Sequence, residues 1–207
     1  MTTPTILALI CLLVPPAAQE HNGERIDRAR ERYEVIADGI FEVAGEDERL
    51  VLFLLTIAKH ESSFRRSIHA GEVKGDAGRS WGLFQLNLGP KPETEIKDTP
   101  YRAEDIVGVD EKATRRAVEV TAGLIAPRIE SCQGAPYCVF KAYAGVAGDP
   151  PYEMEVRLRS RVNTYRKLAG ERAAQKKRAA LPQGLPMPLA TLAEYPAFFL
   201  QGAEGAL

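Results

Sequence analysis

An apolar run ends at a carboxylate in the first third of the chain. The stretch LVLFLLTIA, residues 50–58, is apolar except for Thr56, and KHESSF, residues 59–64, follows it directly. A helix that is apolar almost all round belongs at the centre of a fold, and we expect one over about residues 48–64. A buried carboxylate is costly unless it is paired or put to use, so Glu61 at the end of this helix needs a physical reason.

The rest of the chain is predicted to be mostly helical. Apolar residues recur every three or four positions over residues 24–44, which indicates an amphipathic helix, and Asp47 is placed to cap the helix that follows. Frequent glycines over residues 65–90 predict a small irregular β region, and residues 91–108 read as a surface loop. Three further helices are expected near residues 110–131, 137–147 and 152–169. The predicted fold class is therefore mainly α.

Composition and length indicate one globular domain with tails, or at most two small domains. The 207 residues are 45% hydrophobic and 27% charged, and the formal net charge of -1 argues against a nucleic-acid partner. We divide the chain into an N-terminal apolar segment (1–24), one domain (25–170) and a C-terminal tail (171–207). The tail begins basic and becomes rich in Pro, Ala and Leu.

The N-terminal segment has two interpretations. The run ILALICLLV, residues 6–14, has the length of a signal-peptide core and precedes the small residues PPAA, but no Lys or Arg comes before it. It is too short to span a bilayer, and a helix packed on the domain fits as well. We expect a protein that is exported to the periplasm or outside the cell, or carried in a phage virion. Retention in the cytoplasm stays an alternative.

Two cysteines bracket a short loop. Cys132 and Cys138 enclose QGAPY, and a disulfide closing this loop would join two helix ends in an oxidising compartment. Two free thiols are the alternative. A zinc pair is disfavoured because no second ligand pair at matching spacing exists, and His60 and His69 lie in different local structures. We expect no metal and no cofactor.

Glu61 carries the strongest chemical signal. On a helix it shares a face with three apolar residues at spacings of seven, four and three, namely Leu54, Ile57 and Ala58. Partial burial raises the pKa of a carboxyl, and a carboxyl that stays protonated near neutral pH suits a general acid for a glycosidic bond. The alternative is a structural ion pair with one of three nearby cations: Lys59, Arg65 or Arg66.

Three motifs resemble those of a known family. ESSF (61–64), GLFQLN (82–87) and AYAGV (142–146) are similar to motifs of the lysozyme-like transglycosylases, which include lytic transglycosylases and goose-type lysozymes. The resemblance spans about residues 45–168. It implies a lysozyme-like α+β domain that cleaves the β-1,4 bond between N-acetylmuramic acid and N-acetylglucosamine in peptidoglycan glycan strands. The family usually has Asn at the position of Ala144.

The resemblance also implies residue roles. Glu61 would be the catalytic acid and base, with Ser62 and Phe64 supporting its helix end. The floor and wall of the saccharide groove would come from Gly82, Leu83, Phe84 and Gln85. Tyr143 would reach toward Glu61 or the sugar.

The residues around these motifs have physical uses of their own. Gly82 permits close approach of the backbone to a sugar, and the Gln85 amide can donate and accept hydrogen bonds. Trp81 and Phe84 are either core residues or platforms for sugar rings. Asp76 is either a second carboxylate that orients a water or a turn residue bonded to its own backbone.

Other functions remain open at this point. One is a non-catalytic cell-wall-binding or virion structural module, and another is a helical interaction protein whose basic segment, residues 157–178, binds an acidic partner. For an enzyme, the acceptor is either water or the 6-hydroxyl of the sugar, which gives a 1,6-anhydro product. We expect a monomer without a stable membrane span.

Overall fold

The computed structural model describes residues 1–180. By its contacts the chain divides into two units, residues 1–171 and 172–207. The first unit includes the N-terminal segment, and the described part of the second is the end of one helix. The Pro-rich part of the predicted tail lies outside the described residues.

The described chain is mainly α, as predicted. Its α-helices are α1 (Thr3–Leu13), α2 (Ile26–Ala44), α3 (Glu48–Ser62), α4 (Arg66–His69), α5 (Glu111–Ser131), α6 (Pro136–Tyr143) and α7 (Tyr152–Ala179). Short 3-10 helices are η1 (Pro16–Asn22), η2 (Asp76–Gly78) and η3 (Ala103–Ile106). The strands β1 (Ser80–Trp81) and β2 (Leu86–Asn87) pair antiparallel, with Ser80 opposite Asn87 and Trp81 opposite Leu86. This hairpin is the small β region expected among the glycines.

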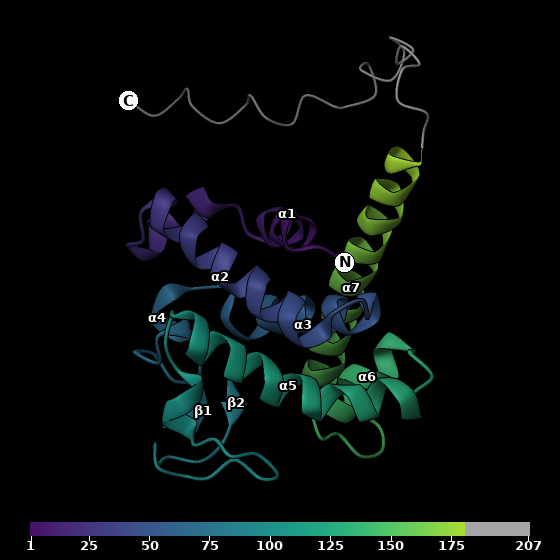
Figure 1. Ribbon diagram of the computed structural model, residues 1–207. Helices are drawn as coiled ribbons and strands as arrows, with labels where there is room; N and C mark the ends of the chain where they lie inside the picture. The colour runs from purple at the N-terminus through teal and green to yellow at the C-terminus, as the bar shows by residue number, and fades with distance from the viewer. Residues whose placement is uncertain (181–207) are drawn as a thin grey trace, which may run out of the picture. The chain divides into compact units, whose positions relative to one another are not determined.

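Helix α3 is the central element of the first unit. Every residue from position 50 to position 58 is buried, and α3 packs against α1, α2 and α5 (Figure 1). Its start is fixed by the predicted cap, because the Asp47 carboxylate accepts hydrogen bonds from the amides of Arg49 and Leu50 at 3.0 and 3.1 Å. The buried apolar run therefore fixes the position of α3 in the core, and Glu61 lies near the C-terminal end of this helix.

An aromatic cluster joins α3 to α6 and α7. The Phe53 ring lies 5.2 Å from the ring of Phe140 on α6 and 4.5 Å from the ring of Tyr165 on α7, measured between centroids. Leu158 and Leu168 of α7 are fully buried as well. These contacts fix α7 beside α3, which decides which α7 side chains reach the end of α3.

Helix α1 packs as part of the first unit. Ile6, Leu9 and Ile10 are fully buried, and the helix lies against α2 and α3. Among residues 1–180, no single helix is both long and apolar enough to cross a bilayer; α1 and η1 pass that test only as a pair bent by 53°.

Buried polar groups tie the N-terminal part to the centre. The Arg32 guanidinium donates two hydrogen bonds to the Glu24 carboxylate, at 2.8 and 2.5 Å, and both side chains are only 4% exposed. His69 is fully buried and its Nε2 lies 3.0 Å from the Thr114 hydroxyl. These bonds offset part of the cost of burial, while Arg32 Nη1 and His69 Nδ1 are buried without a hydrogen-bond partner in the described chain.

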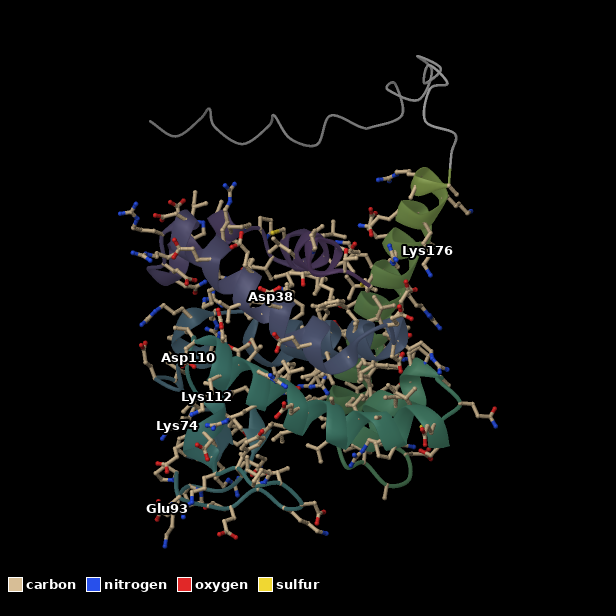
Figure 2. The ribbon with its side chains drawn as sticks, in the orientation of Figure 1. Asp38, Lys74, Glu93, Asp110, Lys112 and Lys176 are labelled. Carbon is tan, nitrogen blue, oxygen red and sulfur yellow. A yellow bond between two sulfur atoms is a disulfide. The ribbon has the colours of Figure 1, made fainter. Side chains whose placement is uncertain are left out.

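The sequence predicts the start of α5 well but places the end of α7 too early. Helix α5 begins close to the expected position because Asp110 caps it, accepting from the Ala113 amide at 3.0 Å; Figure 2 shows Asp110 and Lys112 at its start. Helix α7 continues to Ala179, ten residues beyond the predicted end at 169. Its extra turns are rich in Ala, Lys, Arg and Gln, which are strong helix formers, so the basic segment continues the helix instead of starting a tail.

Candidate active site

Glu61 lies in the last turn of α3, and a tight turn follows it. Ser63 and Phe64 take positive φ angles of 50° and 54°. The Ser62 hydroxyl donates to the Ala58 carbonyl at 2.8 Å and accepts from the Phe64 amide at 3.1 Å. Phe64 is fully buried, edge-on to Tyr33 with 5.8 Å between ring centroids. Ser62 and Phe64 therefore hold the turn that follows Glu61.

The Glu61 carboxylate forms an ion pair with Arg161 of α7. The two residues are 100 positions apart in sequence, and their side chains are 21% and 14% exposed. Arg161 lies one helical turn before Tyr165, whose packing on Phe53 brings this part of α7 to the end of α3.

The sequence offered a nearby cation as the ion-pair partner of Glu61, and this is wrong because the partner is Arg161 of α7. Arg66 pairs with Glu72 at 2.8 Å, and the Arg65 side chain donates to the Ser62 carbonyl at 3.3 Å. Lys59 is half-buried, and burial lowers its pKa. A partner from a distant helix cannot be identified from local spacing.

The surroundings of Glu61 raise its pKa above the ordinary value of a glutamate. Burial is the main cause, because a low-dielectric environment penalises the charged carboxylate. The positive charges of Arg161 and Arg157 oppose this effect, whereas the negative charge of Asp76 adds to it. Glu61 therefore keeps its proton to a higher pH than an exposed glutamate.

Tyr143 and His60 complete the polar surroundings. Burial and the charge of Glu61 raise the pKa of the Tyr143 phenol, so this side chain is neutral at physiological pH. His60 Nε2 lies 2.9 Å from the Thr164 hydroxyl, and burial together with the charge of Arg161 lowers its pKa to about 4. Near neutral pH both His60 and Tyr143 are therefore uncharged.

Asp76 is both a turn residue and a neighbour of Glu61. It has a positive φ of 48°, and its carboxylate accepts a hydrogen bond from the Ser80 hydroxyl at 2.6 Å. Its charge also acts on the carboxyl of Glu61. Asp76 is thus a turn residue whose carboxylate bonds the Ser80 side chain instead of its own backbone, and its role in orienting a water stays a prediction.

The GLFQ segment contributes its apolar side chains to the core. The side chains of Leu83 and Phe84 are buried in the core, at 0% and 1% exposure, so they pack beneath the surface instead of lining a groove as expected. Trp81 is also a core residue and donates to the Gly89 carbonyl at 2.8 Å. Core packing requires the apolar side chains that the groove interpretation assigned to sugar contact.

Gly82 and Gln85 shape the loop itself. Gly82 has a φ of 67°, and a Cβ there would lie 2.9 Å from the Ile106 carbonyl oxygen, so the position requires glycine. The Gln85 amide donates to the Gly82 carbonyl at 3.1 Å. Gln85 is half-buried and packs tightly against Gly75, where an added Cβ would approach its Oε1 to 2.4 Å. Its amide nitrogen therefore helps to hold the loop.

The arginines around Glu61 are the residues that sequence reasoning missed. Arg157 and Arg161 are four positions apart and share one face of α7, and the charge of Arg128 on α5 reaches Tyr143. The basic segment reads in sequence as a solvated helix face. The spacing of Arg157 and Arg161 predicts that they share one face of a helix, but it does not predict which element that face contacts.

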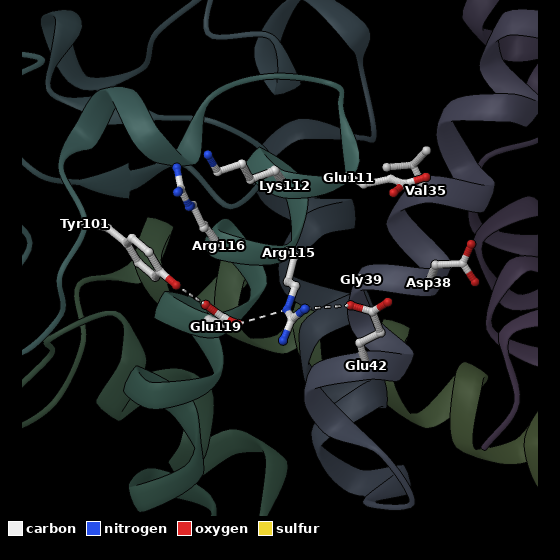
Figure 3. Close-up of a pocket in the computed structure, with 10 residues that line it drawn as sticks. All are labelled: Val35, Asp38, Gly39, Glu42, Tyr101, Glu111, Lys112, Arg115, Arg116 and Glu119. Carbon is white, nitrogen blue, oxygen red and sulfur yellow. Dashed lines mark hydrogen bonds and ion pairs between the residues drawn. The ribbon is translucent and has the colours of Figure 1, made fainter.

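A separate charged cleft of about 510 Å³ lies between α2 and α5. Figure 3 shows Arg115 between two carboxylates, donating to Glu119 at 3.0 Å and pairing with Glu42 at 3.4 Å. The Tyr101 hydroxyl donates to the other oxygen of Glu119 at 2.6 Å. These groups satisfy one another, so we assign no ligand to this cleft.

Cys132 and Cys138 form a disulfide across the α5–α6 corner, with 5.6 Å between their Cα atoms. Helix α6 starts inside this loop and ends at Tyr143, so the bond lies one short helix away from the candidate site. Within residues 1–180, no group of three or more His, Cys, Asp and Glu side chains is arranged to hold a metal.

A scan against protein-family models gave no match for this chain, and searches of curated proteins and of solved structures gave none either. The resemblance to the lysozyme-like transglycosylases therefore rests on the three sequence motifs.

Proposed function

We propose that this chain is a lysozyme-like enzyme that cleaves the β-1,4 bond between N-acetylmuramic acid and N-acetylglucosamine in peptidoglycan. One observation carries the proposal: Glu61 is a partly buried carboxyl with a raised pKa at the end of a buried core helix. A general acid must hold its proton near the working pH and must be held in a fixed position. The ESSF and GLFQLN motifs support the same assignment.

In this proposal Glu61 serves both half-reactions. The protonated carboxyl donates its proton to the glycosidic oxygen, the bond from that oxygen to C1 breaks, and positive charge develops on the sugar ring. The resulting carboxylate then takes a proton from the attacking hydroxyl, which belongs to water or to C6 of the same sugar. Asp76 is the candidate for orienting a water, since its charge reaches Glu61.

The substitution Glu61→Gln tests the catalytic assignment. Glutamine keeps the size of the side chain but cannot donate a proton to the leaving oxygen, so we expect muralytic activity on purified sacculi to fall about 100-fold or more. Glu72→Gln is the matched control, because Glu72 is an exposed glutamate in another ion pair and the variant should keep full activity. Equal rates of cleavage by wild type and Glu61→Gln would show that Glu61 is not the catalytic acid.

The acceptor is identified from the products. Mass spectrometry of the released fragments distinguishes a reducing end, formed by water, from a 1,6-anhydro end, which is lighter by one water. Asp76→Asn should slow the reaction strongly if water is the acceptor, and only weakly if the 6-hydroxyl attacks.

A second candidate is a cell-wall-binding module without turnover. The ion pair with Arg161 favours it, since a carboxylate held by an arginine is also a structural element. A binding module would retain sacculus binding in Glu61→Gln and show no cleavage by wild type. A pelleting assay run beside the activity assay separates the two functions.

A further inference from the structure

Arg161 makes less use of its hydrogen-bonding capacity than its burial would suggest. Its Nη2 donates to Glu61, but within the described chain its Nε is buried and has no hydrogen-bond partner. A guanidinium offers five N–H groups in a planar fork that fits a carboxylate through two parallel hydrogen bonds. The contact with Glu61 uses one arm of that fork.

The charge balance around Arg161 depends on the protonation of Glu61. The charged groups that act on Glu61 are Arg157 and Arg161 of α7 and Asp76 of the glycine-rich loop, while Arg128 of α5 acts on the adjacent Tyr143. His60 and Tyr143 are neutral near pH 7. Once Glu61 takes the proton that acid catalysis requires, Asp76 is the negative charge that remains among these groups to oppose Arg157 and Arg161.

An uncompensated cluster of arginines attracts an anion. We propose that Arg161 binds a carboxylate of the glycan substrate and exchanges its contact with Glu61 for that carboxylate. This inference rests on the proposed function and specifies its substrate. While Glu61 is the anionic partner of Arg161 it has no proton to donate; once the substrate carboxylate takes its place, the Glu61 carboxylate takes up a proton from water and can then donate it to the glycosidic oxygen. That proton transfer is the only covalent change in the exchange.

Peptidoglycan contains two kinds of carboxylate. One is the lactyl carboxylate of N-acetylmuramic acid in strands from which the peptide has been removed, and the other belongs to the stem peptide. The chemistry that Arg161 recognises is common to both. If the lactyl carboxylate is the ligand, a reaction that cleaves the amide between glycan and peptide must come before this one.

Binding measurements on full-length Glu61→Gln separate these cases, because this variant cannot consume the ligand. The probes for titration calorimetry are the disaccharide N-acetylglucosaminyl-N-acetylmuramic acid, the same disaccharide with L-alanyl-D-isoglutamine on its lactyl group, and neutral di-N-acetylchitobiose. We expect at least one acidic probe to bind about tenfold tighter than chitobiose, as a charged hydrogen-bonded pair contributes. The preferred acidic probe identifies the carboxylate.

The preference should depend on Arg161. Adding Arg161→Gln should remove it, whereas adding Arg159→Gln should leave it unchanged, since Arg159 is an exposed arginine of the same helix that pairs with Glu155. Arg161→Lys keeps the charge without the planar fork and should retain a smaller preference, so it serves as the test if Arg161→Gln does not fold.

Equal affinity for all three probes, no binding of any probe, or a preference that survives Arg161→Gln would overturn the inference. Cleavage of sacculi by wild type without an acidic preference would leave the enzyme intact and reject the role of Arg161. An acidic preference without cleavage would support Arg161 as an anion-binding residue and reject the enzyme.

Discussion

Gln19 of η1 donates a hydrogen bond to the carbonyl oxygen of Ser63, 44 positions later, at 3.1 Å. The same Nε2 donates to the Tyr33 hydroxyl at 2.8 Å, and Gln19 is 1% exposed. Ser63 caps the helix that carries Glu61. The segment before α2 thus takes part in shaping the turn next to the candidate catalytic residue.

Helix α1 packs against α2 and α3, so we expect it to contribute to the stability of the fold. Leu9→Ala should lower the free energy of unfolding by about 2–5 kcal/mol, because Leu9 is fully buried and its truncation leaves a cavity. Leu12→Ala is the control on the same helix, as Leu12 is 39% exposed, and it should cost much less. Urea unfolding of the full chain measures both. Equal small effects would show that α1 does not belong to the folded core, as expected of a removable signal sequence.

The pH dependence of activity should respond to Asp76. The negative charge of Asp76 raises the pKa of Glu61, and a general acid loses activity as pH rises through its pKa. Asp76→Asn removes this charge while its side-chain oxygen can still accept from Ser80, so the alkaline limb of the activity profile should move to lower pH. Asp98→Asn is the control at another exposed aspartate with positive φ, and its profile should match wild type. An unmoved alkaline limb in Asp76→Asn would mean that Glu61 does not set it.

Acid should destabilise the fold through His69. Burial lowers the pKa of His69 to about 3, compared with 6.5 for an ordinary histidine, so the unfolded chain takes up a proton before the native one does as pH falls. Stability is then lost by about 1.4 kcal/mol per pH unit for this group, from about pH 6.5 down to the native pKa. His69→Gln keeps a donor for Thr114 but cannot titrate. The difference in unfolding free energy between pH 7 and pH 4.5 should shrink in this variant, and parallel losses in both proteins would contradict the assignment.

The disulfide should stabilise the α5–α6 corner. Cys132 and Cys138 are six positions apart, and closing a loop of that length contributes about 2 kcal/mol on the chain-entropy account. Replacing both cysteines by serine should lower the melting temperature and make it insensitive to reductant, while wild type should melt lower when reduced. Thiol labelling followed by intact mass gives the oxidation state, with Cys11 as the free thiol. Labelling of both Cys132 and Cys138 in the absence of reductant would show that the disulfide does not form.

The elements that the sequence predicts well are those set by local pattern. The apolar run predicts that α3 is buried, Asp47 predicts its start, and the periodicity of residues 24–44 predicts α2. In each case the decisive physics lies within one helix and its cap. The predicted end of α7 at residue 169 is wrong by ten residues, because the residues that follow include several good helix formers and no proline, and the helix continues to Ala179.

Local sequence patterns do not predict which side chains surround Glu61. Its partner Arg161 is selected by the packing of Tyr165 against Phe53, and nothing within several residues of Glu61 encodes that contact. Phe84 was ambiguous for a related reason: an aromatic side chain beside a glycine suits a sugar platform and a core equally well. Only the neighbouring elements decide which of the two it becomes.

The buried pair of Glu24 and Arg32 limits how this sequence can drift over generations. Loss of one partner leaves an uncompensated charge in the interior and costs about 3–5 kcal/mol, whereas an apolar pair of similar volume can be neutral or better. The free energy of unfolding of a typical domain is only about 5–15 kcal/mol, so a lineage that loses either residue alone loses much of its stability. Among descendants of this chain, the two positions should therefore change together or remain as they are.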